Sequence, residues 1–505
     1  MGAHGVWQAG RRAEAAVEQT AVPARTRRRA WALAWSSAAR LGAVSAIVLI
    51  PCFWHSRIHA GDLSSHLYNA WLAGLIREGK LEGLAVVPQW TNILLDWMLR
   101  GLMSLGGPRT AERVAVAACV LVFFWGAFRL VSALARRPAW LLSTCLAVLT
   151  YGWVFHMGFF NFYLSLGLCC WALACFWKQG ARSLAAWLLL LPATLAHALP
   201  VAWALAMGGY IWLARRLRPR RRLILVALAL AGILGLRWSL SASFETDWRF
   251  QQLASASGAD QAWVYGKAYF PVFVGMLAVW GLMPLRRIND HGRLRTFLGT
   301  PFQMALLTGA GVFLLPYFIL FPGHTLALQF LDKRMSLAAA VLVCGLAAAS
   351  RARWLERVLT GLVTVAFFAL LWVDQGRWNR LEDQVERAVR LIGPGQRVVS
   401  GLCLKGSRVD ALRHMVDRAC IGWCFSYGNY EPASGQFSVR ALRPNPVVVS
   451  GRNQAYQLER GVYIVRPEDV PLYQIEWADP GRAIAIRSLK PGDRAGQGAC
   501  VAKLH

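Results

Sequence analysis

Charged side chains are scarce in this chain. Asp, Glu, Lys and Arg make up 16% of its 505 residues, well below the roughly 25% of ordinary soluble domains. Hydrophobic residues reach 56%, with 24 Trp and 23 Phe, which is more than one water-soluble core needs. These values exclude a disordered or purely soluble protein and predict that much of the chain is a membrane bundle.

Several sequence motifs are also absent. The chain has no G-x4-G-K-[ST] loop, which argues against an ATP-driven pump. It has no G-x-S-x-G elbow, which argues against a serine hydrolase. It shows no convincing internal halves with matching interrupted spans, which argues against a secondary transporter.

Apolar stretches long enough to cross a hydrocarbon core of about 30 Å as a helix recur from residue 31 to residue 374. They give about eleven spans. Gln89–Leu105 is either one of these spans or a re-entrant or surface helix, and Asp96 and Arg100, one turn apart, favour the second interpretation. The clearest apolar stretches are Trp31–Trp54, Val114–Leu134, Ala139–Trp177 (with a break near His156–Gly158), Leu184–Ala214, Leu223–Leu240, Tyr269–Leu285, Phe302–Phe321, Ser336–Ser350 and Val358–Val373.

Basic residues cluster in short segments between these stretches. Twenty of the 55 Lys and Arg lie in residues 1–40, 215–222, 285–297 and 350–357. Because Lys and Arg near span ends stay mostly on the cytoplasmic side, we expect a cytoplasmic N-terminus and an outer C-terminus. The net charge of +29 is then mainly an orientation signal, and no nucleic-acid partner is expected.

The composition changes after residue 374, where hydrophobic runs shorten to strand length. We therefore predict a mainly α fold in three parts: a basic cytoplasmic segment (1–30), a transmembrane bundle (31–374) with an outer loop (55–90), and a small α/β extracytoplasmic domain (375–505). In that domain Arg377–Ile392 has the period of an amphipathic helix. The expected strands are Gln396–Ser400, Phe437–Val439, Pro446–Ser450, Gly461–Arg466 and Ala483–Ile486.

Four cysteines lie in this last part, at Cys403, Cys420, Cys424 and Cys500. An even number in an exported domain permits two disulfides, with the pairing left open. A zinc site is the alternative, but there is no C-x2-C pair and only His414 lies nearby.

The expected outer loop begins with polar side chains directly after the first span. Asp62, His66 and Asn69 lie at i, i+4 and i+7 of a helical pattern, so they share one helix face. A carboxylate at the membrane surface, beside an imidazole and an amide, can take a proton from a hydroxyl group. Asp62 is therefore our candidate catalytic base, and the alternative is a helix N-cap beside interfacial histidines.

With this layout the chain resembles the GT-C superfamily of polytopic glycosyltransferases, which includes the protein O-mannosyltransferases and the aminoarabinose transferases of lipid A. Asp62 occupies the position of the acid that follows their first span. Trp90–Leu99, with Gly106-Gly107 and Arg113 beyond, looks like the segment that leads into their next spans. The resemblance covers residues 31–374 in architecture and implies a membrane glycosyltransferase.

The resemblance implies a donor sugar carried on a polyprenyl phosphate, because no nucleotide sugar is available outside the membrane. The acceptor would be a glycan, a lipid or a protein. Lys333 and Arg334, at the edge of the outer 322–334 loop, are placed to stabilise the leaving phosphate, and the alternative is interfacial snorkelling. The further candidate substrate-binding residues are His66, Asn69, Asp96, His156 and His197.

This chemistry requires no metal, because a phosphate leaves readily once Asp62 takes the hydroxyl proton. Glu245 and Asp247, in the outer 242–268 loop, form a carboxylate pair that could hold Mg²⁺ or Mn²⁺. The alternative is a solvated acidic loop.

We therefore expect an integral protein of a bacterial cytoplasmic (inner) membrane, in contact with membrane lipids, that transfers a lipid-linked sugar at the outer face. Two other functions stay open: a transporter or flippase, and a non-catalytic membrane protein of envelope assembly. Under the last interpretation Asp62 would be dispensable.

Overall fold

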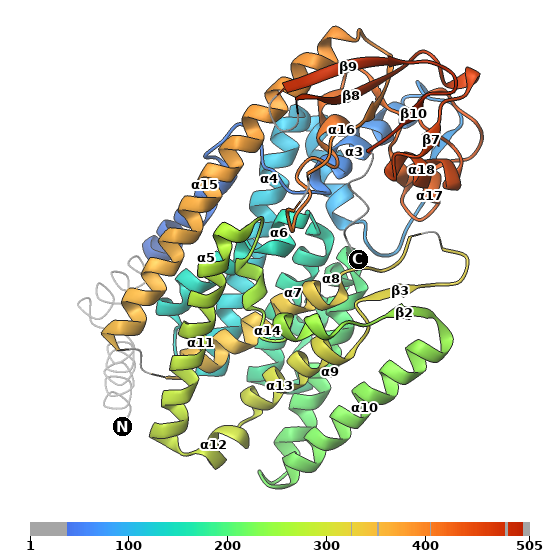
Figure 1. Ribbon diagram of the computed structural model, residues 1–505. Coiled ribbons are helices and arrows are strands. Elements are labelled where there is room, and N and C mark those ends of the chain that lie inside the picture. The colour runs from blue at the N-terminus through green and yellow to red at the C-terminus, as the bar shows by residue number, and fades with distance from the viewer. Residues whose placement is uncertain (1–37, 325, 351–352, 405, 480–482, 498–505) are drawn as a thin grey trace, which may run out of the picture. The chain divides into compact units, whose positions relative to one another are not determined.

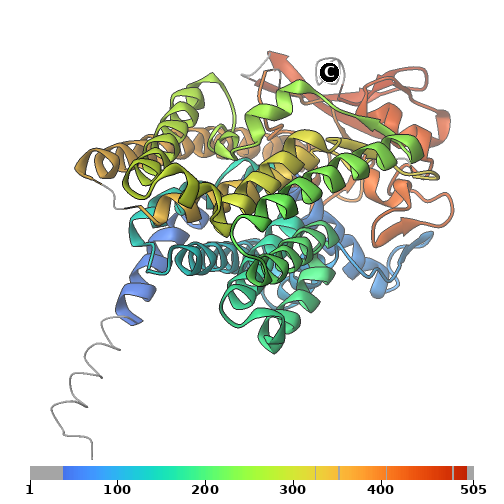
Figure 2. The same ribbon diagram turned by 90° about the horizontal axis from the view of Figure 1, so that it is seen from below.

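The computed structural model describes residues 38–324, 326–350, 353–404, 406–479 and 483–497. The chain divides into two compact units, residues 1–50 and residues 51–505. In the first unit the described residues are helical, and residues 31–37 of the first expected span lie outside them. The second unit is shown from the side in Figure 1 and from below in Figure 2.

The second unit is mainly helical. Its helices up to residue 216 are α3 (Leu63–Arg77), α4 (Leu94–Ala135), α5 (Ser143–Thr150), α6 (Trp153–Met157), α7 (Phe160–Gln179), α8 (Leu184–Ala196) and α9 (Ala198–Arg216). The later helices are α10 (Arg221–Ser243), α11 (Phe270–His291), α12 (Arg293–Phe297), α13 (Thr300–Leu314), α14 (Leu331–Ala348), α15 (Trp354–Leu391), α16 (Met415–Cys420), α17 (Tyr430–Ser434) and α18 (Arg452–Glu459).

Five helical stretches among the described residues are long and apolar enough to cross a membrane. Four apolar helices are shorter, so the count of about eleven spans stays a prediction. The five long stretches are Leu94–Ala135, Trp140–Met157, Phe160–Arg182, Arg221–Ser243 and Trp354–Leu391, and the shorter ones are Ala38–Cys52, Leu184–Ala196, Lys267–Met283 and Thr300–Leu314.

The backbone breaks at two glycines, Gly107 in α4 and Gly158 after α6. Helix α4 is interrupted at Gly107, whose φ of 75° and ψ of 179° are not helical, directly before Pro108. The part before this kink, from Leu94, spans only about 20 Å at 1.5 Å per residue and is too short to cross the membrane. This length favours the surface-helix interpretation. The predicted break near Gly158 is confirmed, because Gly158 ends α6 with φ +83°.

Helix α15 joins two elements that the sequence analysis treats separately. It is continuous for 38 residues, so the last expected span runs without interruption into the amphipathic segment (Figure 1). Leu381, Val385 and Ala388 are buried on one face of this segment, as the helical period predicts.

A four-stranded sheet follows, gathered at one end of the helices in Figure 1. Its order is β5-β4-β8-β9, with β4 parallel to both neighbours and β9 antiparallel to β8. The strands are β4 (Arg397–Ser400), β5 (Phe425–Ser426), β8 (Leu472–Asp479) and β9 (Ala483–Leu489). The smaller pairs are β1 (Leu84–Val86) with β6 (Val439–Ala441), β2 (Glu245–Asp247) with β3 (Phe318–Leu320), and β7 (Tyr463–Ile464) with β10 (Arg494–Ala495).

Four of the five expected strands overlap an observed strand, and the fifth does not. Pro446–Ser450 is not a strand, because Asn445 turns the chain there and its side-chain oxygen accepts hydrogen bonds from the backbone N–H groups of Val447 and Val448. The sequence analysis also missed β8, the longest strand. The β1–β6 pair joins the outer loop to the C-terminal part of the chain.

The cysteines form disulfides, as expected. Cys420 and Cys424 are bonded to each other, and Cys403 is also in a disulfide. Cys500 lies outside the described residues.

A buried ion-pair network joins three elements of this unit. The Arg418 guanidinium on α16 donates two hydrogen bonds to Glu382 on α15, at 2.6 and 2.5 Å, and one to Glu112 on α4 at 2.7 Å. It also donates to the backbone carbonyl of Ile58 at 3.0 Å. The side chains of Arg418, Glu112 and Glu382 are 9%, 4% and 1% exposed, so all three charges depend on one another for compensation.

Removing Arg418 should destabilise the protein strongly. Arg418→Ala takes away the guanidinium that hydrogen-bonds both buried carboxylates and leaves Glu382 only the more distant Arg57, at 3.7 Å. We expect a loss of about 3–5 kcal/mol in the free energy of unfolding. The measurement is thermal and denaturant unfolding of the purified protein in detergent. Arg443→Ala is the matched control, because Arg443 pairs with Glu82 at the surface with side chains 68% and 89% exposed. Equal stability losses in the two variants would contradict the structural role of the network.

Candidate active site

Asp62 lies at the start of α3, in a turn that packs closely on the end of α6. The backbone N–H groups of Gly61 and Asp62 donate hydrogen bonds to the carbonyls of His156 and Met157, at 2.8 and 3.0 Å. A Cβ at Gly158 would lie 2.4 Å from the Asp62 nitrogen. The two turns can approach this closely only because position 158 is a glycine, and the contact fixes where Asp62 stands.

The Asp62 side chain is available for chemistry. Asp62 occupies the N-cap position of α3, yet its carboxylate makes no capping hydrogen bond among the described residues. The side chain is 26% exposed, and its Oδ1 lies 3.8 Å from Nε2 of His414. Asp62 thus stands where an N-cap residue stands, as the alternative interpretation expects, but its carboxylate does not cap the helix.

Arg334, in the first turn of α14, belongs to the same site. The Asp62 carboxylate is the charge that most favours the guanidinium, whose central carbon lies 3.8 Å from the centre of the Phe159 ring. Its Nε is buried and has no hydrogen-bond partner in the described part of the chain. The charge of Asp62 therefore acts on Arg334, 272 positions away in the sequence.

Lys333 lies away from this pair. Its ammonium nitrogen is 5.0 Å from the centre of the Trp153 ring, and the charges of Arg408, Asp332 and Asp260 act on it. The two adjacent basic side chains thus pack on different rings, Lys333 on Trp153 and Arg334 on Phe159, and the charge of Asp62 acts on Arg334. Burial raises the pKa of Asp260 to about 6, against the opposing charge of Arg408.

His66, Asp96 and Glu431 form a second cluster next to Asp62. His66 Nδ1 lies 2.8 Å from Asp96 Oδ1, and Ser65 donates a 2.8 Å hydrogen bond to Glu431. Burial lowers the pKa of His66, but Asp96 and then Glu431 and Asp62 outweigh it and raise the pKa to about 9. Burial raises the pKa of Glu431 to about 7, against the opposing effect of His66 and with a further increase from Asp96.

Asn69 ties α3 to the C-terminal part of the chain. Its side-chain oxygen accepts a 2.8 Å hydrogen bond from Asn429, and its own amide donates to the Ser65 carbonyl at 3.0 Å. Asn69 is buried. It therefore holds the wall of the site in place, and its side chain does not face an open cavity.

The two further histidines have structural partners. His156 Nδ1 lies 3.1 Å from both the His59 carbonyl and the Tyr265 hydroxyl. His197 caps α9, since its Nδ1 accepts a hydrogen bond from the Leu199 backbone N–H at 3.2 Å. The charge of Arg334 acts on His197, so His197 borders the site, while His156 supports it through the backbone contact with Gly61.

Glu245 and Asp247 lie on β2. The Asp247 carboxylate accepts a 2.6 Å hydrogen bond from the Tyr317 hydroxyl and pairs with Arg249 at 3.3 Å. Among the described residues, no group of three or more His, Cys, Asp or Glu side chains is arranged to hold a metal ion. The Asp247 carboxylate thus has protein partners, and a divalent cation at this pair stays a prediction.

Sequence reasoning missed the residues that the C-terminal part contributes. Glu431, Tyr430 and His414 all approach the Asp62 region. The aromatic, turn-rich segment Phe425–Pro432, which includes Tyr430 and Glu431, is the sequence signal that could have found two of them. His414 appeared only as a possible zinc ligand.

The arrangement combines a carboxylate that can accept a proton with a guanidinium that can bind an anion. The carboxylate of Asp62 stands in the more exposed position, and Arg334 is packed on an aromatic ring with an unused N–H. Such a pair suits a reaction in which a hydroxyl loses a proton and an anionic group departs.

Comparisons with known proteins give no further information about the site. No family model, curated protein or solved structure matches the chain. The functional interpretation therefore depends on the geometry described above.

Adding one methyl group at Gly158 should displace Asp62. Gly158→Ala places a Cβ against the Asp62 nitrogen and forces the two turns apart, so we expect a lower melting temperature and loss of any activity that needs Asp62. Gly79→Ala is the matched control, because Gly79 also has positive φ but nothing lies within 4 Å of a Cβ there. Thermal unfolding of both variants checks this, and equal effects would show that only backbone strain matters.

The stability of the protein should depend on the charge of Glu431. Its pKa is about 7 in the fold against an ordinary 4.5, so the folded state takes up a proton and stability falls as the pH rises from about 4.5 to 7. Glu431→Gln keeps the acceptor for Ser65 and has no charge to titrate. Its melting temperature relative to wild type should therefore be higher at pH 7.5 than at pH 5. A difference that is the same at both pH values would refute the buried position of this group.

Proposed function

We propose that this protein is a membrane glycosyltransferase of the GT-C type, which transfers a sugar from a polyprenyl-phosphate-linked donor to an acceptor hydroxyl at the outer face. The observation that carries the proposal is the partly exposed Asp62 carboxylate, which makes no capping hydrogen bond and lies 3.8 Å from His414. Arg334, whose charge it favours, has a buried Nε without a hydrogen-bond partner among the described residues. Asp62 acts as the general base and Arg334 binds the phosphate of the donor.

The topology belongs to the same proposal. About eleven spans, a cytoplasmic N-terminus and an outer C-terminus place the site on the side of the membrane where the C-terminal part lies. A bacterial inner membrane supplies a polyprenyl phosphate carrier on that side. The pairing of β1 with β6 supports a shared location of the outer loop and the C-terminal part.

The reaction follows from the two groups. Asp62 takes the proton of the acceptor hydroxyl, and the hydroxyl oxygen attacks the anomeric carbon of the sugar. The bond between that carbon and the phosphate oxygen breaks, and its electron pair stays with the polyprenyl phosphate. The fixed positive charge of Arg334 stabilises the departing phosphate without reorganising.

Arg334 is suited to this role by its environment. A guanidinium presents several N–H donors in a planar fork that matches phosphate oxygens. Stacking on Phe159 orients that plane, and the buried Nε without a partner in the described structure is a donor still to be satisfied. A phosphate oxygen beside Asp62 would satisfy it.

Substitution of either residue should abolish transfer. We expect Asp62→Asn to lower the rate by about 10²–10⁴-fold, the contribution of a general base, and Arg334→Met to raise KM and lower kcat together. Glu82→Gln and Arg443→Met are matched controls at an exposed ion pair and should leave the rate unchanged. The assay follows release of polyprenyl phosphate in proteoliposomes from C55 donors that carry labelled glucose, mannose or arabinose, with a bacterial envelope extract added to supply acceptor hydroxyls.

Two outcomes would contradict the proposal. Full activity of Asp62→Asn would show that Asp62 is not the general base. A wild-type protein that moves the labelled donor across the bilayer without cleaving it would support the flippase alternative instead.

A further inference from the structure

A histidine and an aspartate of the C-terminal part form a dyad beside Asp62. His414, directly before α16, is buried, with its side chain 5% exposed. Its Nδ1 lies 2.7 Å from Asp417 Oδ2. Because an ionised carboxylate only accepts hydrogen bonds, this contact places the proton on Nδ1 and leaves the lone pair on Nε2.

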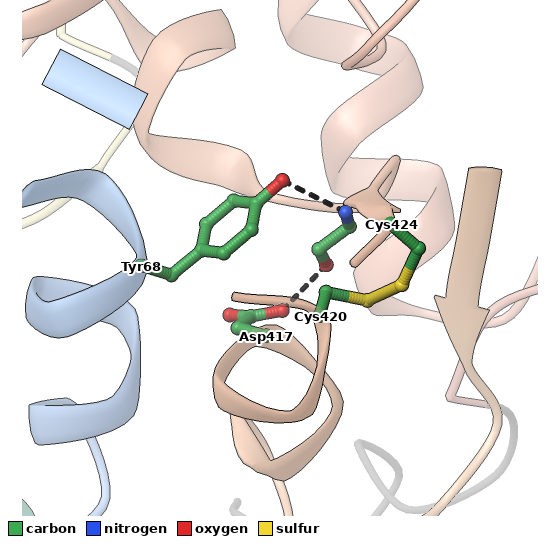
Figure 3. Close-up of a disulfide and its surroundings, with 5 residues drawn as sticks. Tyr68, Asp417, Cys420 and Cys424 are labelled. Atoms are coloured by element: carbon green, nitrogen blue, oxygen red, sulfur yellow. Dashed lines mark hydrogen bonds between the residues drawn. A yellow bond between two sulfur atoms is a disulfide. The ribbon is translucent and has the colours of Figure 1, made fainter. Parts of the chain in front are cut away.

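The dyad is held rigidly. The second carboxylate oxygen of Asp417 accepts a 2.5 Å hydrogen bond from the Ser426 hydroxyl, and the Ser426 backbone N–H donates to the Tyr68 hydroxyl at 2.8 Å. Figure 3 shows these contacts beside the Cys420–Cys424 disulfide, which links α16 to the start of β5. Asp417 therefore orients the imidazole of His414 from a position fixed by covalent and hydrogen-bonded neighbours.

The free edge of the imidazole points at the proposed base. Nε2 of His414 has no hydrogen-bond partner among the described residues and lies 3.8 Å from Asp62 Oδ1. At 3.8 Å the two atoms are too far apart for a direct hydrogen bond, and a small movement of either side chain brings them within hydrogen-bond distance. A buried polar atom without a partner needs an explanation, and a catalytic role is one.

His414 also borders a small polar pocket of about 40 Å³ on the C-terminal side, with Ser400, Arg413, Asp417 and Gln497 in its walls. This volume holds on the order of two or three water molecules. The imidazole therefore stands between the Asp62 carboxylate and a space that water can fill.

We propose that His414, oriented by Asp417, is the proton relay of the active site and carries the acceptor-hydroxyl proton from Asp62 to water in this pocket. The relay deepens the proposed function and rests on it. It makes the C-terminal part of the chain a component of the active site.

The proton balance is simple. Asp62 becomes neutral when it takes the hydroxyl proton, and it must lose that proton before the next turnover. The proton passes to the lone pair of Nε2 after a small movement that brings the two groups together. The Asp417 carboxylate stabilises the imidazolium, and the proton leaves Nε2 for pocket water when the side chain moves towards the pocket.

The charged groups around His414 favour this transient imidazolium. Asp62 faces it from the start of α3 and Asp417 from α16. Asp410 and Glu431 also act on it electrostatically. The opposing cation is Arg413, which shares the pocket wall and is neutralised by an ion pair with Glu459. The Tyr430 ring packs 5.6 Å away, centre to centre.

The experiment compares His414→Ala, Asp417→Asn and Asp62→Asn in the polyprenyl-phosphate release assay with the same C55 donors. We expect His414→Ala to lower the turnover rate by about 10²-fold, and added imidazole to restore at least part of it. The pH–rate profile of this variant should lose the limb that depends on His414. Asp417→Asn should change the pH profile and lower kcat with little change in KM.

The matched control is His324→Ala, because His324 is exposed in the 322–334 loop and lies near Phe321. It should keep the wild-type rate. Melting temperatures of all variants show whether each one folds. If His414→Ala does not fold, His414→Gln takes its place.

The results separate the relay from the proposed function. If Asp62→Asn is inactive while His414→Ala keeps the wild-type rate and pH profile, the relay is refuted and the function stands. A reduced rate that imidazole does not restore, with an unchanged pH profile, would assign His414 a structural role and also refute the relay. If the wild-type protein cleaves none of the donors, the proposed function fails first and the relay with it.

Discussion

The buried guanidinium of Arg418 is the interaction on which the rest of the unit depends. It pairs with Glu112 on α4 and with Glu382 on α15, and it holds the carbonyl of Ile58 in the loop before Asp62. Hydrophobic contacts alone would allow these elements to slide against one another, because apolar packing is not directional. The hydrogen bonds of Arg418 to three partners, Glu112, Glu382 and Ile58, are directional, so they fix how α4, α15 and α16 align with one another.

Burying such a network costs free energy. Burying three charges removes their hydration, and the mutual attraction only repays that loss when every partner is in place. The network therefore contributes specificity more than stability. Arg418 lies on α16 with Asp417, four residues after His414, so the same register that pairs the charges also sets the imidazole beside Asp62. A shift of α16 by one helical turn would break the ion pairs of Arg418 and also move His414 away from Asp62.

The sequence predicts the fold where the signal is local and fails where it depends on distant contacts. Apolar length predicts the long helices, and the glycine at position 158 predicts the break after α6. The helical period predicts the buried face of α15, but the polar residues near Gln375 suggest an interruption that is absent. Gln375 is buried because its amide contacts the His59 carbonyl and the Tyr265 hydroxyl, partners more than 100 positions away.

The site shows the same division. Asp62 and Arg334 could be predicted because each breaks a local rule, an acid directly after an apolar stretch and a basic residue where basic residues are sparse. His414 and Glu431 break no local rule, since both lie in a segment with ordinary soluble composition. Their place in the site follows only from the three-dimensional fold, since Glu431 accepts a hydrogen bond from Ser65, which lies 366 positions away in the sequence. A general base at Asp62, as proposed, must pass its proton on, and the ends of apolar helices provide few groups that can exchange it with water. The C-terminal part supplies such groups, because His414 lies 3.8 Å from Asp62 and borders a polar pocket.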